Sequence, residues 1–292
     1  MANWRGRSRG NKSGYSIFVW VLKNFGVFPA YFLLRFVSFY FFLFSYTASK
    51  NTLHLYRKRL GYSWLRSMGM LYNNYYRFGM SLIDKVVVMS GMRNRFSFDF
   101  DGEEHLHQMV QQGNGGLLLS AHVGNWEIAG HLLKRLGTTI NIVMFDGEQQ
   151  QIKQYLSTVT GARAVNVIVI KNDISHIYEI SEALSRKELV CIHADRFVEG
   201  NKTLMLDFVG SPAKFPVGPF VLAATFRVPV SFVFAMKESD LHYHFFATPD
   251  QTDTTLSKVQ LTQKLARGFA DEMENKLKTY PEQWYNFYNF WQ

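Results

Sequence analysis

Hydrophobic positions follow two patterns along this chain, with a change near residue 93. Between residues 15 and 92, apolar and aromatic residues run on without interruption or recur at helical spacing, which predicts helices. After residue 93, short apolar runs alternate with longer segments of helical period. Alternation of this kind is typical of an α/β domain with right-handed crossovers. We therefore expect a central, mostly parallel sheet flanked by helices, preceded by a helical N-terminal region.

The pattern also gives the expected elements and divisions. The expected strands cover residues 96–100, 116–121, 139–144, 165–170, 188–193, 229–236 and 242–248, the last two as an antiparallel pair. The expected helices cover 56–92 (as one or two pieces), 103–112, 128–136, 148–158, 174–185 and 256–280, with another beginning near Phe220 after a rigid loop at 212–219. We expect a basic tail at 1–14, a membrane-associated helical region at 15–92 and a catalytic domain at 93–292.

The N-terminal region has the composition of a membrane segment. Residues 25–46 hold one charged residue, Arg35, and are long enough to cross about 30 Å of hydrocarbon. Fourteen of the residues from 15 to 46 are aromatic, and Pro29 is expected to end or kink a first helical piece. An arginine near the centre of a span costs about 2.5–3.5 kcal/mol on insertion scales. A spanning helix and a helix lying in the membrane interface both remain open.

Charge is distributed unevenly. Residues 1–100 hold 15 Lys and Arg against 2 Asp and Glu, whereas residues 101–292 hold 17 against 21. The basic residues flank an apolar aromatic run and form no reading helix, so nucleic-acid binding is disfavoured and an anionic membrane surface fits better. No small-residue cleavage site follows the apolar run, so we expect no removable signal peptide. The single cysteine, Cys191, excludes an internal disulfide and suits a cytoplasmic catalytic face.

The strongest chemical signal lies at the end of the expected strand 116–121, in Ser120-Ala-His-Val-Gly-Asn-Trp-Glu127. Asn125 suits a helix N-cap, and Glu127 falls in that helix's first turn. His122 and Glu127 do not share a helical face, so they meet only if His122 stands off the helix on a turn permitted by Gly124. A carboxylate that orients an imidazole makes it a general base for a hydroxyl. The alternative is a capped helix start with a satisfied histidine.

Other catalytic signatures are absent from the sequence. There is no G-x-S-x-G elbow for a serine hydrolase and no H-E-x-x-H zinc motif. Asp195 and Arg196 follow the expected strand 188–193 and so fall at the same sheet edge as His122. Arg196 is a candidate for binding phosphate or carboxylate, with Asp195 orienting it, although such a pair also occurs as a surface salt bridge. Lys214 and the backbone near Gly218 are further candidate contacts for phosphate or a thioester oxygen.

The segment at residues 120–127 and the block at residues 193–218 resemble the late lipid A acyltransferases. The first matches the family's H-x4-D/E signature, and His193-Ala-Asp195-Arg196 with Phe208-Val-Gly-Ser-Pro-Ala-Lys-Phe-Pro-Val-Gly218 matches its second block in order and spacing. The resemblance implies a glycerol-3-phosphate-acyltransferase-like fold at the inner membrane with its catalytic domain facing the cytoplasm. It implies an acyl-carrier-protein or CoA thioester donor and a lipid or glycolipid hydroxyl acceptor, and no metal or redox cofactor.

The resemblance assigns catalysis to His122 and Glu127, and substrate binding to Asn125, Asp195, Arg196, Lys214 and Gly218. Backbone amides at residues 124–125 or in the Gly218 loop are the expected oxyanion donors. Residues 281–291 lack the family's basic ending and look more like acyltransferases of aryl-polyene and flexirubin pigment clusters. A lipid A precursor is the first expectation for the acceptor, with a pigment lipid as the alternative. A third possibility, from a different class, is a non-catalytic protein that binds lipid or acyl carrier protein.

Overall fold

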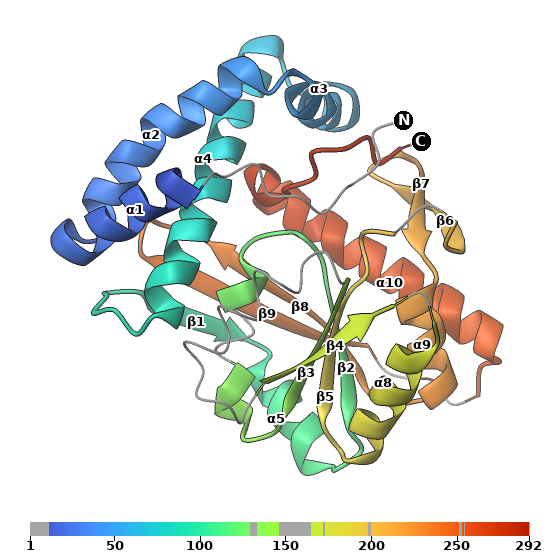
Figure 1. The fold of residues 1–292 in the computed structure, drawn as a ribbon. Coiled ribbons are helices and arrows are strands. Elements are labelled where there is room, and N and C mark those ends of the chain that lie inside the picture. The colour runs from blue at the N-terminus through green and yellow to red at the C-terminus, as the bar shows by residue number, and fades with distance from the viewer. Residues whose placement is uncertain are drawn as a thin grey trace.

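A seven-stranded sheet forms the centre of the computed structural model, which describes residues 12–128, 133–145, 165–171, 173–197, 200–250, 253 and 255–291 (Figure 1). Strand order is β1-β9-β8-β2-β5-β3-β4, and all neighbouring pairs are parallel except β8 with β9. The α/β fold expected from the alternation is therefore confirmed. The strands are β1 Ser97–Asp101, β2 Gly116–Ser120, β3 Ile140–Phe145, β4 Val165–Ile170, β5 Leu189–His193, β8 Val230–Lys237 and β9 His242–Asp250.

Helices cover both faces of the sheet. One face packs against α8 (Ser175–Ser185), α9 (Gly218–Phe226) and α10 (Lys258–Thr279), and the cluster includes the fully buried Phe269. The other face packs against α5 (Glu103–Gln111) and the 3-10 turn η2 (Leu133–Leu136). Burial on both faces explains why β2 is an uninterrupted apolar run.

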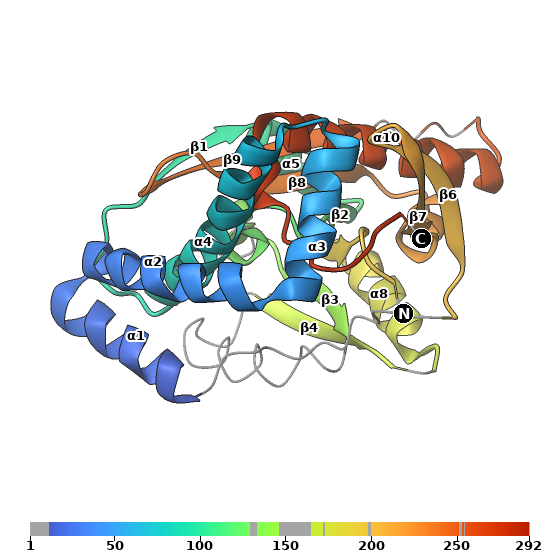
Figure 2. The same cartoon turned by 90° about the horizontal axis from the view of Figure 1, so that it is seen from above.

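The N-terminal helices form a layer at the end of the molecule opposite α8 and α9 (Figures 1 and 2). They are α1 (Lys12–Phe25), α2 (Val27–Phe44), α3 (Tyr46–His54), the π-helical turn η1 (Leu55–Arg59) and α4 (Trp64–Met89). The break between α1 and α2 lies at Gly26, which has a positive φ of 84°, and Pro29 sits in the first turn of α2. The expected break is confirmed, and Pro29 is tolerated there because the first helical amides have no carbonyl partner within the helix.

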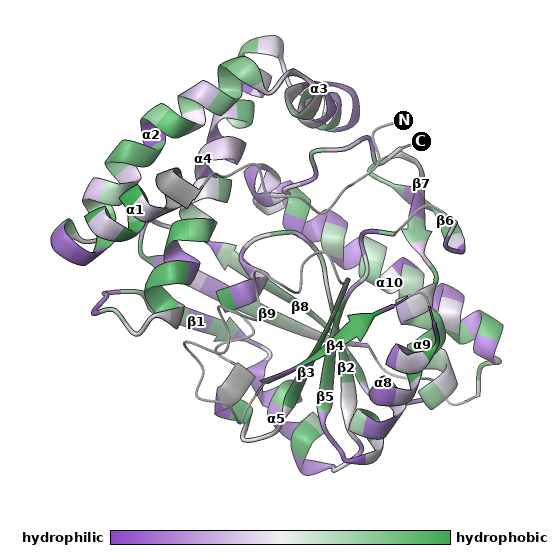
Figure 3. Cartoon of the chain, viewed as in Figure 1, coloured by the Kyte–Doolittle hydropathy of each residue, from purple (hydrophilic) through white to green (hydrophobic). Residues whose placement is uncertain are grey.

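One side of α2 packs on α4, and the other carries exposed aromatic residues. Ala30, Tyr31 and Leu34 are buried against α4 and α1. The hydropathy colouring shows green apolar turns along α2, interrupted by pale and purple positions (Figure 3), and the helix as a whole has a mean hydropathy of 1.8. Its large exposed hydrophobic side chains are Phe28, Phe32, Phe36, Phe39, Tyr40, Leu43 and Phe44. Of the described helices, α2 is the one long and apolar enough to cross a membrane by length and composition.

Two expected elements need comment. The expectation of a rigid loop at 212–219 is wrong. Residues Ser211–Pro216 form strand β7 of a hairpin with β6 (Thr203–Phe208), and Gly218 already begins α9. Pro212 and Pro216 lack an amide proton, which disfavours a strand in the middle of a sheet. They fit in β7 because this strand pairs only with β6, so its other edge needs no backbone hydrogen bonds. Where a helix was expected at 128–136, residues 126–128 are helical and η2 covers Leu133–Leu136. Residues 129–132 and the expected helix 148–158 lie outside the described residues.

Candidate active site

The turn after β2 fixes the position of His122. Gly124 has a positive φ of 69°, and a Cβ there would collide with the carbonyl oxygen of Ala235. The amide of Gly124 donates to the carbonyl of Gln283 at 2.8 Å, and that of Asn125 donates to Ala235 at 2.7 Å. A residue with a Cβ atom therefore does not fit this close to β8, so the turn requires glycine at position 124. The turn lifts His122 off the following helix, as the sequence predicted.

Asn125 closes the turn and starts the helix. Its Oδ1 accepts from the amide of Ile128 at 3.4 Å, which confirms the expected N-cap. Its Nδ2 donates both protons inside the protein, to the carbonyl of Ser81 at 3.0 Å and to the hydroxyl of Tyr243 at 3.1 Å. These groups use both of its amide protons, so Asn125 builds the turn, and its expected contact with substrate stays a prediction.

His122 is held by Asp195. The Nδ1 atom of the imidazole lies 2.8 Å from Oδ1 of the carboxylate, and the backbone amide of His122 donates to Oδ2 at 3.0 Å. Both residues end neighbouring parallel strands, which brings them to one sheet edge. The Asp195 side chain is 1% exposed. Burial alone raises its pKa, but the charge and hydrogen bond of His122, with Arg196, hold that pKa well below its usual range. The site thus joins an imidazole to an ionised carboxylate.

Glu127 is not the partner of that imidazole. Its Oε1 pairs with Nζ of Lys85 on α4 at 2.5 Å, with both side chains mostly buried. The expected orientation of His122 by Glu127 is therefore wrong, because the helix that starts after Asn125 directs Glu127 toward α4 while Asp195 occupies Nδ1. Lys85 carried no recognisable signal in the sequence, since it lies in a helix that looked like part of the membrane region.

His193 packs beside His122. The two ring centroids lie 4.5 Å apart, and the Trp126 ring meets His193 edge-on at 4.6 Å. Burial, with the charge of His122, lowers the pKa of His193 to about 3, so this ring is neutral at ordinary pH. Its buried Nδ1 has no hydrogen-bond partner within the described part of the chain. His193 was missed as a site residue because nothing along the chain placed its ring on His122.

A metal ion has a possible ligand set here. His122, His193 and Asp195 each offer one ligand atom, and these atoms lie within 4.8 Å of one another. Imidazole nitrogens and a carboxylate oxygen are ligands that zinc accepts. The sequence led us to expect no metal. The hydrogen bond between His122 and Asp195 satisfies both of these groups without a metal ion.

Comparison with known proteins identifies the family of this chain. A family model described as bacterial lipid A biosynthesis acyltransferase matches residues 67–292. The chain belongs to this acyltransferase family. A phosphatidylinositol mannoside acyltransferase of Mycobacterium tuberculosis is 28% identical over 123 residues, covering 42% of this chain and 39% of that protein. One of Mycolicibacterium smegmatis is 23% identical over 189 residues, covering 64% of this chain and 60% of that protein. The chain matches less than two thirds of the length of either relative.

Arg196 of this acyltransferase is turned toward the C-terminal segment. Its Nη2 donates to the carbonyl of Tyr285 at 2.9 Å, and its guanidinium lies 5.9 Å from the Tyr288 ring centroid. The Tyr288 hydroxyl donates to the carbonyl of Asp195 at 3.2 Å, and the Tyr285 amide donates to the carbonyl of His122 at 3.1 Å. The aromatic ending, which differs from the basic ending expected of the lipid A enzymes, therefore forms one wall of the candidate site.

The expected oxyanion donors need revision. The amides of Gly124 and Asn125 already donate to backbone carbonyls, so an oxyanion hole there is wrong. Lys214 lies in β7 opposite Met205, and Gly218 begins α9. Within the described residues, no hydrogen bond or ion pair joins Lys214 or Gly218 to His122 or Asp195. Their substrate contacts stay predictions for the acyltransferase.

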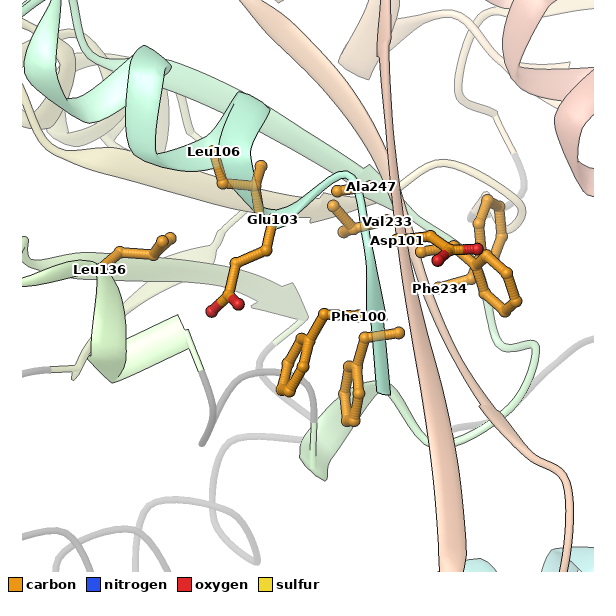
Figure 4. Close-up of a pocket in the computed structure, with 10 residues that line it drawn as sticks. Phe100, Asp101, Glu103, Leu106, Leu136, Val233, Phe234 and Ala247 are labelled. Atoms are coloured by element: carbon orange, nitrogen blue, oxygen red, sulfur yellow. The ribbon is translucent and has the colours of Figure 1, made fainter. Parts of the chain in front are cut away.

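A separate apolar hollow lies on the sheet face covered by α5 (Figure 4). Its lining comes from β1, α5, η2, β8 and β9, and its charged members are Asp101 and Glu103. It contains none of the residues around His122, so it does not belong to the site described above.

Proposed function

We propose that this acyltransferase moves a fatty acyl chain from an acyl-carrier-protein or CoA thioester to a hydroxyl of a membrane glycolipid, a lipid A precursor being the first candidate. The observation that supports this reaction is the buried Asp195 carboxylate on Nδ1 of His122. An imidazole held in this way presents Nε2 as a base. Family membership supports the choice of acyl transfer over a non-catalytic binding role.

The chemistry requires one base and one carboxylate. Nε2 of His122 takes the proton of the acceptor hydroxyl as its oxygen attacks the thioester carbonyl. Asp195 stabilises the imidazolium that forms. The carbon–sulfur bond then breaks, and the imidazolium returns its proton to the leaving thiolate. The products are an ester on the acceptor and the free thiol of the carrier, so no acyl-enzyme intermediate is required.

Membrane attachment fits the exposed side of α2. Phe32 is 61% exposed and Phe36 is 62% exposed, and both lie opposite the side that packs on α4. Because Arg35 is also exposed and α2 is fixed along the protein, we propose that α2 lies in the interface and does not span. Because both thioester carriers occur in the cytoplasm, the membrane in this proposal is the inner membrane, with the catalytic domain on its cytoplasmic side. An acidic acyl carrier protein suits the basic N-terminal third.

The acceptor is a separate question from the reaction. The relatives are described as phosphatidylinositol mannoside acyltransferases, which supports a glycolipid acceptor in general. A pigment lipid is the second candidate, because the aromatic C-terminal segment that resembles the pigment-cluster enzymes contacts His122, Asp195 and Arg196.

The test compares total membrane lipids, by mass spectrometry, from cells with the gene, without it, and with His122→Ala. A lipid A species lighter by one acyl chain in the last two strains supports the lipid A assignment. Unchanged lipid A with a lost or unesterified aryl polyene moves the acceptor to the pigment lipid. Full acylation with folded His122→Ala protein would falsify the proposed reaction.

A further inference from the structure

A buried charged pair joins the catalytic domain to the N-terminal helices. Nζ of Lys237 on β8 lies 2.6 Å from Oδ2 of Asp84 on α4, and the two side chains are 3% and 0% exposed. Every donor of the ammonium is used, since Nζ also donates to the carbonyl of Asp240 at 2.6 Å and to the hydroxyl of Tyr31 at 3.2 Å. Removing two charges from water is costly, and an apolar pair of similar volume is often as stable. The pair therefore calls for an explanation beyond stability.

Two tyrosines extend the pair to other elements. The hydroxyls of Tyr31 on α2 and Tyr243 on β9 both donate to the Asp84 carboxylate. Both side chains are buried. The four residues come from α2, α4, β8 and β9, so the network fixes four elements at one point. Polar networks that are fully satisfied select one arrangement of the elements around them.

Two routes lead from this network to the turn that carries His122. Through side chains, the Tyr243 hydroxyl accepts from Nδ2 of Asn125 at 3.1 Å. Through the backbone, the amide and carbonyl of Lys237 each bond the Gln283 side-chain amide at 2.8 Å. The carbonyl of Gln283 in turn accepts from the amide of Gly124. Both routes end on the two residues that set the backbone after His122.

The network also reaches the exposed aromatic side of the molecule. Tyr31 lies in α2 between Phe28 and Phe32, whose side chains are 58% and 61% exposed. The hydroxyl of Tyr31 is thus a direct link between the helix we assign to the membrane interface and the carboxylate that holds Tyr243.

We propose that Lys237, Asp84 and Tyr243 are positioning residues of this acyltransferase. They fix the turn that carries His122, and through Tyr31 they set its position relative to α2. The inference rests on the proposed function of His122, and it predicts two separable effects. Loss of the link to the turn lowers kcat, whereas loss of the link to α2 weakens use of an acceptor that is embedded in a membrane.

Three tyrosine variants test this with palmitoyl-acyl-carrier-protein as donor and vesicles of total lipid from the source cells as acceptor. Tyr243→Phe removes the hydroxyl next to Asn125, and we expect kcat per folded enzyme to fall about tenfold or more, because small misplacements of a base are costly. Tyr31→Phe should raise the KM for the vesicle acceptor about threefold or more and leave kcat within about twofold. Tyr72→Phe is the matched control: its hydroxyl donates to the Arg35 carbonyl of α2 outside the network, and its kinetics should stay unchanged.

The outcomes separate this inference from the proposed function. If Tyr243→Phe lowers only the melting temperature and keeps wild-type kcat per folded enzyme, the network is structural and the inference is wrong. The same holds if Tyr31→Phe and Tyr72→Phe have the same KM. An isosteric double variant, Asp84→Asn with Lys237→Met, gives a second measurement, since it should fold yet lower kcat. His122→Ala is measured alongside, and its full activity would instead overturn the proposed function.

Discussion

Glu127 forms an ion pair with Lys85 of α4 at 2.5 Å, although it lies only five residues after His122. The carboxylate on Nδ1 of His122 comes instead from Asp195, at the end of the neighbouring strand. The first helical turn after β2 thus braces the catalytic turn against the N-terminal helices, and the sheet supplies the carboxylate. Two acidic residues near one histidine therefore have different tasks.

Asp195→Asn should reduce kcat by about a thousandfold or more, because the imidazole loses the charge that stabilises its protonated form. Glu127→Gln should reduce kcat by less than about tenfold, since it weakens a brace between a turn and a helix. Rates of acyl transfer per folded enzyme measure both effects. The assignment of roles is wrong if Glu127→Gln is the more damaging of the two variants.

The fold and the sheet edge that carries His122 and Asp195 could be predicted because they depend on order along the chain. Apolar runs marked the strands, and parallel strands bring their carboxyl ends together, which put His122 and Asp195 at one edge. The partner of His122 could not be predicted from spacing, because the direction of Glu127 depends on where α4 packs. The hairpin at residues 203–216 was missed because proline rules assume two neighbouring strands. Hydropathy likewise cannot tell which side of α2 faces α4.

His193→Phe should make stability less dependent on pH. The lowered pKa of His193 means that the unfolded chain binds this proton more readily than the folded protein. Its contribution to folding is therefore complete above about pH 6.5, the ordinary value, and is lost as pH falls from there toward about 3. One such group changes the free energy of unfolding by at most about 1.4 kcal/mol per pH unit. Denaturant unfolding of wild type and variant between pH 7 and 4 measures the difference.

The phenylalanine ring keeps the contact with His122 and removes the unpartnered Nδ1, so the variant should fold. Parallel stability curves for the two proteins across that pH range would show that His193 is not the titrating group.

Gly124→Ala should destabilise the protein by several kcal/mol or prevent folding. The residue has positive φ, and the added methyl group meets the carbonyl of Ala235 in the central sheet. Gly69→Ala is a suitable control, because Gly69 lies in α4 with open space around its Cα and alanine there should add about 0.5–1 kcal/mol. Thermal unfolding of both variants gives the comparison, and equal melting temperatures would contradict the account of the turn.

Replacing Phe32 and Phe36 by serine should weaken binding to anionic vesicles about tenfold for each residue, which corresponds to the loss of roughly half-buried aromatic area. Tyr178→Ser is the control, because Tyr178 is 68% exposed on α8, at the other end of the molecule. Vesicle sedimentation measures the partition of each protein. Equal effects from the two sites would mean that α2 is not the membrane-facing surface.

The central position of β2 in the sheet determines how readily the backbone before His122 exchanges its amide hydrogens. Both edges of β2 are paired, with β5 and β8, and its residues are fully buried. The amides of Leu117 and Leu119 should be among the last to exchange with solvent hydrogen, because breaking this strand free means breaking the sheet in two. The wall beside His122, by contrast, comes from residues 284–291 outside the sheet. Strand β2 can therefore stay rigid while the sequence of this wall varies, so under the proposed function a change of acceptor requires no change in the sheet.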